Sequence, residues 1–356
     1  MCMINWKQGY ESTWRIMHVN PKTWTDDKNM GNVASVSISH DGTDDVPLLE
    51  TADLEYDGDF EDGWYRIEML ANQNGSTELV KLGTFRFTAS SNTYYGNNRH
   101  TVSASGVSAL HPAKDMKCRI GEFVGRGEDG ARYILKMLKK ALPGPIRILG
   151  DSTFIIDEYQ VFDASTPYIT AVWNILDKAG WCLQINGLGE VIVRPMPTEA
   201  SFILNRDLYC IVQPEFDKDY NLTDIPNVYR VIDGDKEVEV INDDPSSVIS
   251  TVSRGYRIEE VDTSPQLVDG ETLYNYARRM LVDKSSIISK WSYRREYIPD
   301  VYPFSKIIAD RKDIGFTGSA TVLSQSITCD KGITVDETVG IEVSNYATNY
   351  VELSSS

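Results

Sequence analysis

The sequence predicts a mainly β protein with α+β content, in which two antiparallel β-barrel domains flank a smaller α+β middle domain. Short segments with strand periodicity, separated by turn residues, fill the first 110 residues without a long helical pattern. Two helical apolar stripes follow, and strand periodicity then returns. We therefore place domains at residues 1–110, 111–200 and 201–356, the last carrying a helical excursion near 250–284.

The first domain is expected to be β-sheet throughout. The predicted strands are residues 14–19, 33–40, 64–70, 84–89 and 100–105. Turn residues separate them at 29–32, 40–42, 62–63, 73–75 and 95–98. Many short strands at regular turn spacing favour a closed barrel or a sandwich.

The middle domain begins with a predicted helix over residues 131–142. Its apolar stripe consists of Ile134, Leu135, Leu138 and Leu142. The run Pro143-Gly144-Pro145 ends this helix, because proline cannot continue the helical hydrogen-bond ladder. A short strand is expected at 146–149.

A stronger helix follows, with Ser165 or Thr166 as its cap and Pro167 at its first position. Gly180 is the expected end of this helix. A hairpin over 181–193 comes next, and it turns at Asn186-Gly187-Leu188-Gly189. Two prolines just beyond the hairpin mark the exit from this domain.

The third domain is predicted to return to strands and to carry one helix. The helix, residues 271–282 after Asp269-Gly270, places Leu273, Tyr276, Ala277, Met280 and Leu281 on one side. This side must rest on another element, which we expect to be a β-barrel or sandwich because strands flank the helix on both sides. The expected strands are 201–212, 227–232, 237–241, 246–257, 287–297, 320–328, 332–335, 340–343 and 350–353.

Composition bounds the function classes. The chain has 356 residues, of which 41% are apolar and 24% are charged, which is typical of soluble globular domains. No apolar run approaches the roughly 20 residues that cross a bilayer, and no secretion signal is recognisable, so synthesis in a cytoplasm is expected. The net charge of −17 argues against wrapping nucleic acid. It is compatible both with ordinary solubility and with a carboxylate-lined duct that repels passing DNA.

No catalytic, cofactor-binding or metal-binding residue can be singled out, and no cofactor is expected. The five cysteines, Cys2, Cys118, Cys182, Cys210 and Cys329, are odd in number and lack C-x-x-C spacing, which argues against disulfides or structural zinc. The four histidines, His18, His40, His100 and His111, lack the spacing of a catalytic zinc site.

Two motifs imitate binding sites. The run Gly125–Gly130 has the letters G-x-G-x-x-G before a helix, with Asp151 about 20 residues further on. Glu128 and Asp129 stand where phosphate oxygens would sit, so we interpret the run as a loop that caps a helix. Residues 57–63 imitate a calcium loop, but the glycine is one position late and strands flank it, so the EF-hand geometry fails. An acidic hairpin turn is expected, and a looser oxygen-rich site stays open as the alternative.

The order of segments in the third domain resembles the hub proteins of phage tail tips and baseplates, the late control protein D family. The resemblance is carried by Ile225-Pro226-Asn227, the serine-rich predicted strand up to Arg254-Gly255, and the helix over 274–280. The helix-Gly-Trp sequence with its Asn-Gly-x-Gly turn resembles the middle domain of the same family. Val19-Asn20-Pro21 and the serine-alternating 33–39 resemble the opening of its tube-like first barrel.

The resemblance implies a structural virion protein and no enzyme. Three copies would form a ring that joins the six-fold tail tube to the three-fold tip and leaves a channel for DNA, which passes without specific binding. The implied partners are the chain itself as a homotrimer, the tail tube, distal tail and baseplate proteins, a tail spike or tip protein, and the tape measure protein.

The implied location is the tail tip or baseplate of a virion assembled in the host cytoplasm. Contractile, long flexible and bacteriocin-type tails all stay open. The alternative function is a glycan-binding or glycan-hydrolysing tail or cell-surface protein, because two carboxylates need only be close in space and the 19 tyrosines and 7 tryptophans could line a sugar site.

Overall fold

The computed structural model confirms a mainly β chain with α+β content. It describes residues 4–6, 8–41, 50–95, 100–150, 152–205, 211–219, 223–265, 267, 271–285, 287–343 and 350–354. These residues divide into two compact units, the larger formed by 1–216 with 292–339 and the smaller by 217–291 with 340–356. Within the described residues no helix is both long and apolar enough to span a membrane.

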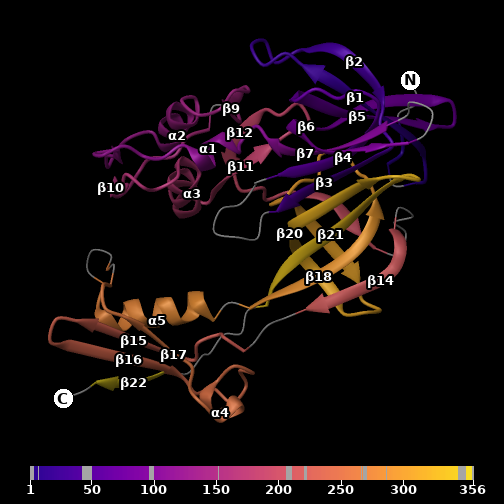
Figure 1. Cartoon of the computed structure of the whole chain (residues 1–356). Helices are drawn as coiled ribbons and strands as arrows, with labels where there is room; N and C mark the ends of the chain where they lie inside the picture. Colours follow the sequence, from indigo (N-terminus) through magenta and orange to yellow (C-terminus); the bar gives the residue numbers. More distant parts are fainter. Residues whose placement is uncertain are drawn as a thin grey trace. The chain divides into compact units, whose positions relative to one another are not determined.

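Within the described ranges, thirteen strands form one large sheet, and most of these strands are labelled in Figure 1. They are β1 (Glu11–Val19), β2 (Asp26–Asn32), β3 (Ser35–Asp41), β4 (Thr51–Asp57), β5 (Gly63–Gln73), β6 (Ser76–Tyr94), β7 (His100–Ser108), β13 (Ala200–Leu204), β14 (Ile211–Asp219), β18 (Ile287–Glu296), β19 (Lys306–Arg311), β20 (Phe316–Cys329) and β21 (Ile333–Val343). The main path is β14-β18-β21-β20-β3-β4-β7-β6-β5-β1-β2, and β13 and β19 branch from β20. Among the described strands this path has two ends and does not close into a barrel.

Local sequence explains much of this sheet. The predicted turn at Asn74-Gly75 joins β5 to β6, and both residues have positive φ angles, 50° and 81°, as a tight two-residue hairpin requires. The alternating pattern of β3 buries Val36 and Ile38 and leaves its serines toward solvent. One face of the sheet thus covers a core built from Ile16, Ile38, Leu54, Ile67, Met69, Phe85, Phe87, Ala104 and Ile327.

The residues after β7 form an α+β module with its own core (Figure 1). Its elements are α1 (Pro112–Asp115), β8 (Phe123–Val124), α2 (Gly130–Leu138), β9 (Ile146–Ile148), β10 (Gln160–Val161), α3 (Tyr168–Ala179), β11 (Trp181–Ile185) and β12 (Val191–Pro195). As predicted, α3 ends at Gly180, whose φ of 67° is left-handed, and the β11–β12 hairpin follows at once. Pro167 is the residue before α3 rather than its first residue, and α2 ends four residues earlier than expected.

The smaller unit consists of a four-stranded sheet and two helices. The sheet order is β17 (Glu259–Asp262), β15 (Val228–Asp233), β16 (Lys236–Asn242) and β22 (Tyr350–Ser354). Helix α5 (Leu273–Lys284) lies along this sheet and buries Tyr276, Ala277 and Leu281 against Tyr229 and Val240 (Figure 1). This confirms the predicted packing, although the expected start signal Asp269-Gly270 lies outside the described residues.

Local predictions for residues 246–257 and 29–32 are wrong. The serine-rich segment 246–257 is not a strand, since it contains the one-turn helix α4 (Thr251–Arg254), whose first turn is capped by the Ser250 hydroxyl. Serine favours a cap over a strand when its oxygen can accept a hydrogen bond from a free helix amide. Residues 29–32, expected as a turn, belong to β2 and pair with β1, with register shifts that absorb the irregular sequence.

Candidate functional site

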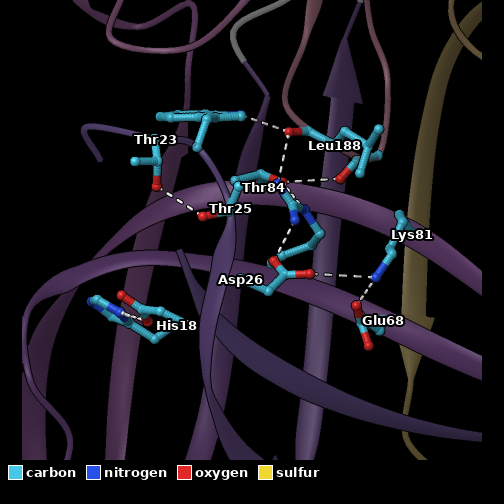
Figure 2. Close-up of polar contacts among 12 residues, drawn as sticks. His18, Thr23, Thr25, Asp26, Glu68, Lys81, Thr84 and Leu188 are labelled. Atoms are coloured by element: carbon cyan, nitrogen blue, oxygen red, sulfur yellow. Dashed lines mark hydrogen bonds and ion pairs between the residues drawn. The ribbon is translucent and has the colours of Figure 1, made fainter. Parts of the chain in front are cut away.

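The turn of the β11–β12 hairpin docks on the large sheet (Figure 2). The indole Nε1 of Trp24 donates a 2.8 Å hydrogen bond to the carbonyl oxygen of Leu188, and Nη2 of Arg66 donates to the same oxygen at 3.2 Å. The hydroxyl of Thr84 donates to the carbonyl of Gly187 at 3.0 Å. We call this contact the module junction, because it holds the α+β module against β5 and β6.

Two glycines make the module junction possible. A side chain at Gly187 would overlap the backbone carbonyl of Lys81. A Cβ at Gly189 would lie 2.8 Å from the Cβ of Thr84, and its φ of 71° also favours glycine. The Asn-Gly-x-Gly sequence is therefore needed for close approach of two backbones, in addition to forming the hairpin turn.

A charged cluster supports the module junction from below (Figure 2). Arg66 forms an ion pair with Asp26, and Lys81 lies between Asp26 and Glu68. Arg15 contacts the far side of Glu68, with 2.9 Å between Nε and Oε2. Burial lowers the pKa of Arg66 and of Lys81, and the charge of Asp26 opposes this shift. The alternating charges hold the Arg66 guanidinium in place to donate to the hairpin.

A second region is a solvent-facing part of the sheet, formed by β20, β3, β4 and β7. Register pairs place its side chains in rows across the strands, for example Ser37 with Asp53 and Asp53 with Ser105. The members are Ser324, Ser326, Thr328, Ser35, Ser37, Ser39, Asp41, Thr51, Asp53, Glu55, Asp57, Thr101, Ser103, Ser105 and Val107. We call this set the polar face. It contains hydroxyls, carboxylates and one valine and no lysine or arginine, and Arg86 of the neighbouring strand lies at its margin, opposite Val107.

Hydrogen bonds hold two of the carboxylates of the polar face in position. The Ser105 hydroxyl donates to Asp53 at 2.7 Å, and the Thr101 hydroxyl donates to Asp57 at 2.8 Å. Asp53, Glu55 and Asp57 are all exposed. The polar face therefore presents a fixed row of negative charge.

A buried charged network lies elsewhere in the same sheet. Arg295 of β18 and Glu337 of β21 form a two-pronged ion pair, with 3.1 and 2.6 Å between their atoms, and both side chains are at most 1% exposed. Tyr293 also donates to Glu337. Burial by itself raises the pKa of Glu337, but the Arg295 charge and the hydrogen bonds outweigh it and lower this pKa.

In the smaller unit, Asn227 joins three backbone segments. Its side-chain amide donates to the carbonyls of Ile249 and Tyr256 at 3.1 and 3.0 Å, and its oxygen accepts from the amide of Ile258 at 2.7 Å. Arg254 donates to the carbonyl of Ile225 at 2.6 Å. The segments around Pro226-Asn227 and Arg254-Gly255, which carry the family resemblance, are thus hydrogen-bonded to each other.

Three solved structures share this architecture. They are a tail protein from Neisseria meningitidis (TM-score 0.65, 11% identity, 93% of this chain and 97% of that chain), the 43 kDa tail protein of prophage MuSo2 from Shewanella oneidensis (0.60, 10%, 92% and 97%) and the prophage tail protein gp18 from Listeria monocytogenes (0.52, 10%, 94% and 95%). The chain has the fold of phage tail proteins. No protein-family model and no curated protein matches the sequence.

This tail-protein fold confirms the resemblance that the sequence suggested, at the level of fold. The coverage matters, since more than nine-tenths of both chains align in each pair. The similarity therefore includes the large sheet, the α+β module and the smaller unit.

The glycine-rich run Gly125–Gly130 uses its amides within the module. The amide of Gly125 donates to Glu128 at 3.0 Å, and that of Gly130 donates to the carbonyl of Phe154 at 2.8 Å. Asp129 caps α2 by accepting from the amide of Arg132 at 3.0 Å. The run is a helix-capping loop, as the sequence indicated. Asp151 lies outside the described residues.

The histidines and cysteines do not converge. Each histidine has a different carboxylate neighbour, Asp27 for His18, Glu50 for His40, Asp59 for His100 and Asp115 for His111. Over the described ranges no group of three or more His, Cys, Asp or Glu residues could hold a metal ion. Cys118, Cys182 and Cys329 are buried thiols, and Cys2 and Cys210 lie outside these ranges.

The acidic run 57–63 was predicted to be a hairpin turn. It connects β4 to β5, which do not pair, so it is not a hairpin turn.

Sequence reasoning missed the residues that receive the hairpin. Trp24 and Thr84 lie 164 and 103 positions from their partners in the turn, and nothing local links them. The only available signal was the pair of glycines in the Asn-Gly-x-Gly turn, which is one more than a two-residue hairpin needs.

Proposed function

We propose that this chain is a structural virion protein, the hub of a phage baseplate or tail tip. Three copies form a ring that joins the six-fold tail tube to the three-fold tip and leaves a channel for DNA. The tail-protein fold, shared along nearly the whole chain, supports a tail or baseplate role. The mechanism is assembly, and no bond is made or broken.

The polar face is the observation that best supports the proposed DNA channel. A surface that lets a duplex slide must not attract phosphate, and lysine or arginine would do so. The polar face offers fixed carboxylates and small hydroxyls over four adjacent strands instead. We propose that the three copies turn this face toward the channel.

The proposed ring has two tube-like β domains in each copy, residues 1–110 and 201–356, on either side of the module 111–200, and the open large sheet contains strands of both. Six such domains match the six-fold tube. The sheet path ends at β2 and β14, and strand edges of this kind can pair between subunits. A stable ring of this type buries about 2,000 Å² or more at each contact.

The partners in this proposal are the tail tube, distal tail and baseplate proteins, a spike or tip protein and the tape measure protein. The location is the virion tail, with assembly in the host cytoplasm.

The solution mass tests the ring. We expect light scattering on a sizing column to give about 120 kDa, three times 40.1 kDa, and negative-stain images of that peak to show three-fold rings. If the chain stays a monomer both alone and with a tail tube protein, the proposal fails.

A charge reversal tests the channel. The triple variant D53K/E55K/D57K should make the ring retain a short DNA duplex at 50 mM salt, with affinity at least about 10-fold above wild type and falling steeply as salt rises. The control is D157K/E158K/D163K, which changes the same charge at exposed positions of the module. Equal DNA binding by both variants would contradict the assignment of the polar face to the channel.

A further inference from the structure

Two neighbouring hollows lie at the start of β1. One has a volume of about 420 Å³ and is lined by Ser12 and the turn 331–334. The other measures about 530 Å³ and is lined by the turn 72–75. Tyr10, Glu11 and Glu296 line both hollows, and we call the two hollows together the groove.

Glu296 is the unusual member of this groove. Its Oε2 atom is buried and has no hydrogen-bond partner. Burial raises the pKa of this carboxyl. An unpartnered buried carboxylate oxygen is costly, and a cation brought to the groove would reduce that cost.

Tyr10 forms a fixed wall of the groove. Its hydroxyl donates to the carbonyl of Tyr297 at 3.0 Å, and Trp6 packs edge-on against its ring with centroids 5.1 Å apart. An aromatic ring held next to a carboxylate is a favourable environment for a guanidinium or ammonium group.

The first half of β1 also has a free edge. Glu11 to Trp14 pair with β5 on one side, whereas the pairing of β1 with β2 begins only at Arg15. Within the described strands, nothing pairs with the other side of Glu11 to Trp14. No residue of β5 lines the 420 Å³ hollow, which contacts Glu11 and Ser12 of β1. This hollow therefore contacts two of the four residues that form the free edge.

We propose that this groove binds an extended segment of a partner protein that carries an arginine or lysine. The segment pairs with the free edge of β1, and its cationic side chain enters the groove between Tyr10, Glu11 and Glu296. Addition of a strand to a free edge supplies backbone hydrogen bonds, and the groove supplies selectivity for the positive charge. The site goes beyond the proposed hub function and does not depend on the ring.

The charges around the groove favour such a ligand. Glu11 and Glu296 contribute two carboxylates, and Lys331 on the β20–β21 turn contributes the single opposing charge among the described lining residues. The whole chain carries −17, so it attracts basic segments at long range as well.

The test uses the peptide acetyl-Val-Thr-Arg-Thr-Val-amide and the same peptide with norleucine in place of arginine. Calorimetric titration of the full chain should show the arginine peptide binding at least 10-fold more tightly. The variant Glu296→Gln should weaken the arginine peptide at least 10-fold, and the control Glu61→Gln, which removes an exposed carboxylate elsewhere, should change it less than 2-fold. Circular dichroism and melting verify that each variant is folded.

A third peptide, methylated on the backbone nitrogens, tests the strand pairing and should bind at least 10-fold more weakly. Equal binding of the arginine and norleucine peptides, no binding at 5 mM, or unchanged binding to folded Glu296→Gln would each overturn the proposal. Equal binding of the methylated peptide would overturn the pairing with β1.

Discussion

The sheet contains two charged clusters that use the same residue types differently. Around Arg295 and Glu337 the charges are sealed from water and satisfy each other. Around Arg66 and Asp26 only part of the cluster reaches water: the side chains of Asp26 and Lys81 are 26% and 27% exposed, whereas Arg66 is buried and directs one amino group to the carbonyl of Leu188 in the module. The first cluster joins neighbouring strands of one sheet, whereas the second joins two layers of the fold.

The difference in burial indicates which property each cluster controls. Removing one partner from a sealed pair leaves an uncompensated buried charge, so the cost falls on the stability of the sheet. In the second cluster water can replace part of a lost ion pair. Removing one partner there should therefore disturb the position of the β11–β12 hairpin more than it lowers the global stability. The following predictions test this contrast, from the largest expected effect to the smallest.

Glu337→Ala should lower the free energy of unfolding by about 3–5 kcal/mol, because Arg295 then stays buried without its partner. Urea unfolding at pH 7 measures this. Asp336→Ala is the matched control, since it removes the neighbouring carboxylate from a half-exposed pair with Arg294 and should lower the free energy of unfolding far less than Glu337→Ala does. Similar costs for the two variants would contradict the contrast.

The same network predicts an acid dependence. Because the folded-state pKa of Glu337 is lowered below its ordinary value of about 4.3, its contribution is complete well above that value and is lost as pH falls through the folded pKa. The difference in urea midpoint between wild type and Glu337→Ala should therefore narrow from pH 7 to pH 3. A constant difference over this range would mean that folding does not lower the pKa of Glu337.

Asn227→Ala should cost about 2–3 kcal/mol in the smaller unit, because buried backbone groups at Ile249, Tyr256 and Ile258 lose their shared partner. Hydrogen exchange of the Ile258 amide should speed up together with the loss in urea midpoint. Asn275→Ala on the exposed side of α5 provides a control for the residue type and should change stability by less than about 0.5 kcal/mol. Protection of Ile258 as in wild type would exclude the proposed bridging role.

Gly187→Ala should cost about 1–3 kcal/mol and loosen the module junction, since the new methyl overlaps the backbone at Lys81. Limited proteolysis of the β11–β12 hairpin is the second measurement. The fractional rise in the cleavage rate should exceed the fractional fall in the urea midpoint. Gly332→Ala adds the same methyl into open space and should be neutral. A Gly187→Ala protein as protected as wild type would show that the hairpin does not dock through this contact.

Local chemistry determined several parts of the structure from sequence alone. The end of α3 at Gly180, the tight turn at Asn74-Gly75 and the apolar side of α5 follow from φ preference and periodicity, which act over a few residues. The absence of a recognisable catalytic motif also came from spacing in the sequence. The resemblance to phage tail proteins depended on the order of segments and is confirmed by the fold.

Only the tertiary structure decided which distant segments meet. The pairing of Ile38 with Ile327, the sealed pair of Arg295 and Glu337, and the contact of Trp24 with Leu188 join residues far apart in the chain. Backbone pairing uses groups common to all residues, so the sequence of one strand does not identify its neighbour. Whether an arginine becomes a buried structural residue or an exposed charge depends on that neighbour. For this reason the polar face, the module junction and the groove at Glu296 could be identified only from the strand pairing in the tertiary structure.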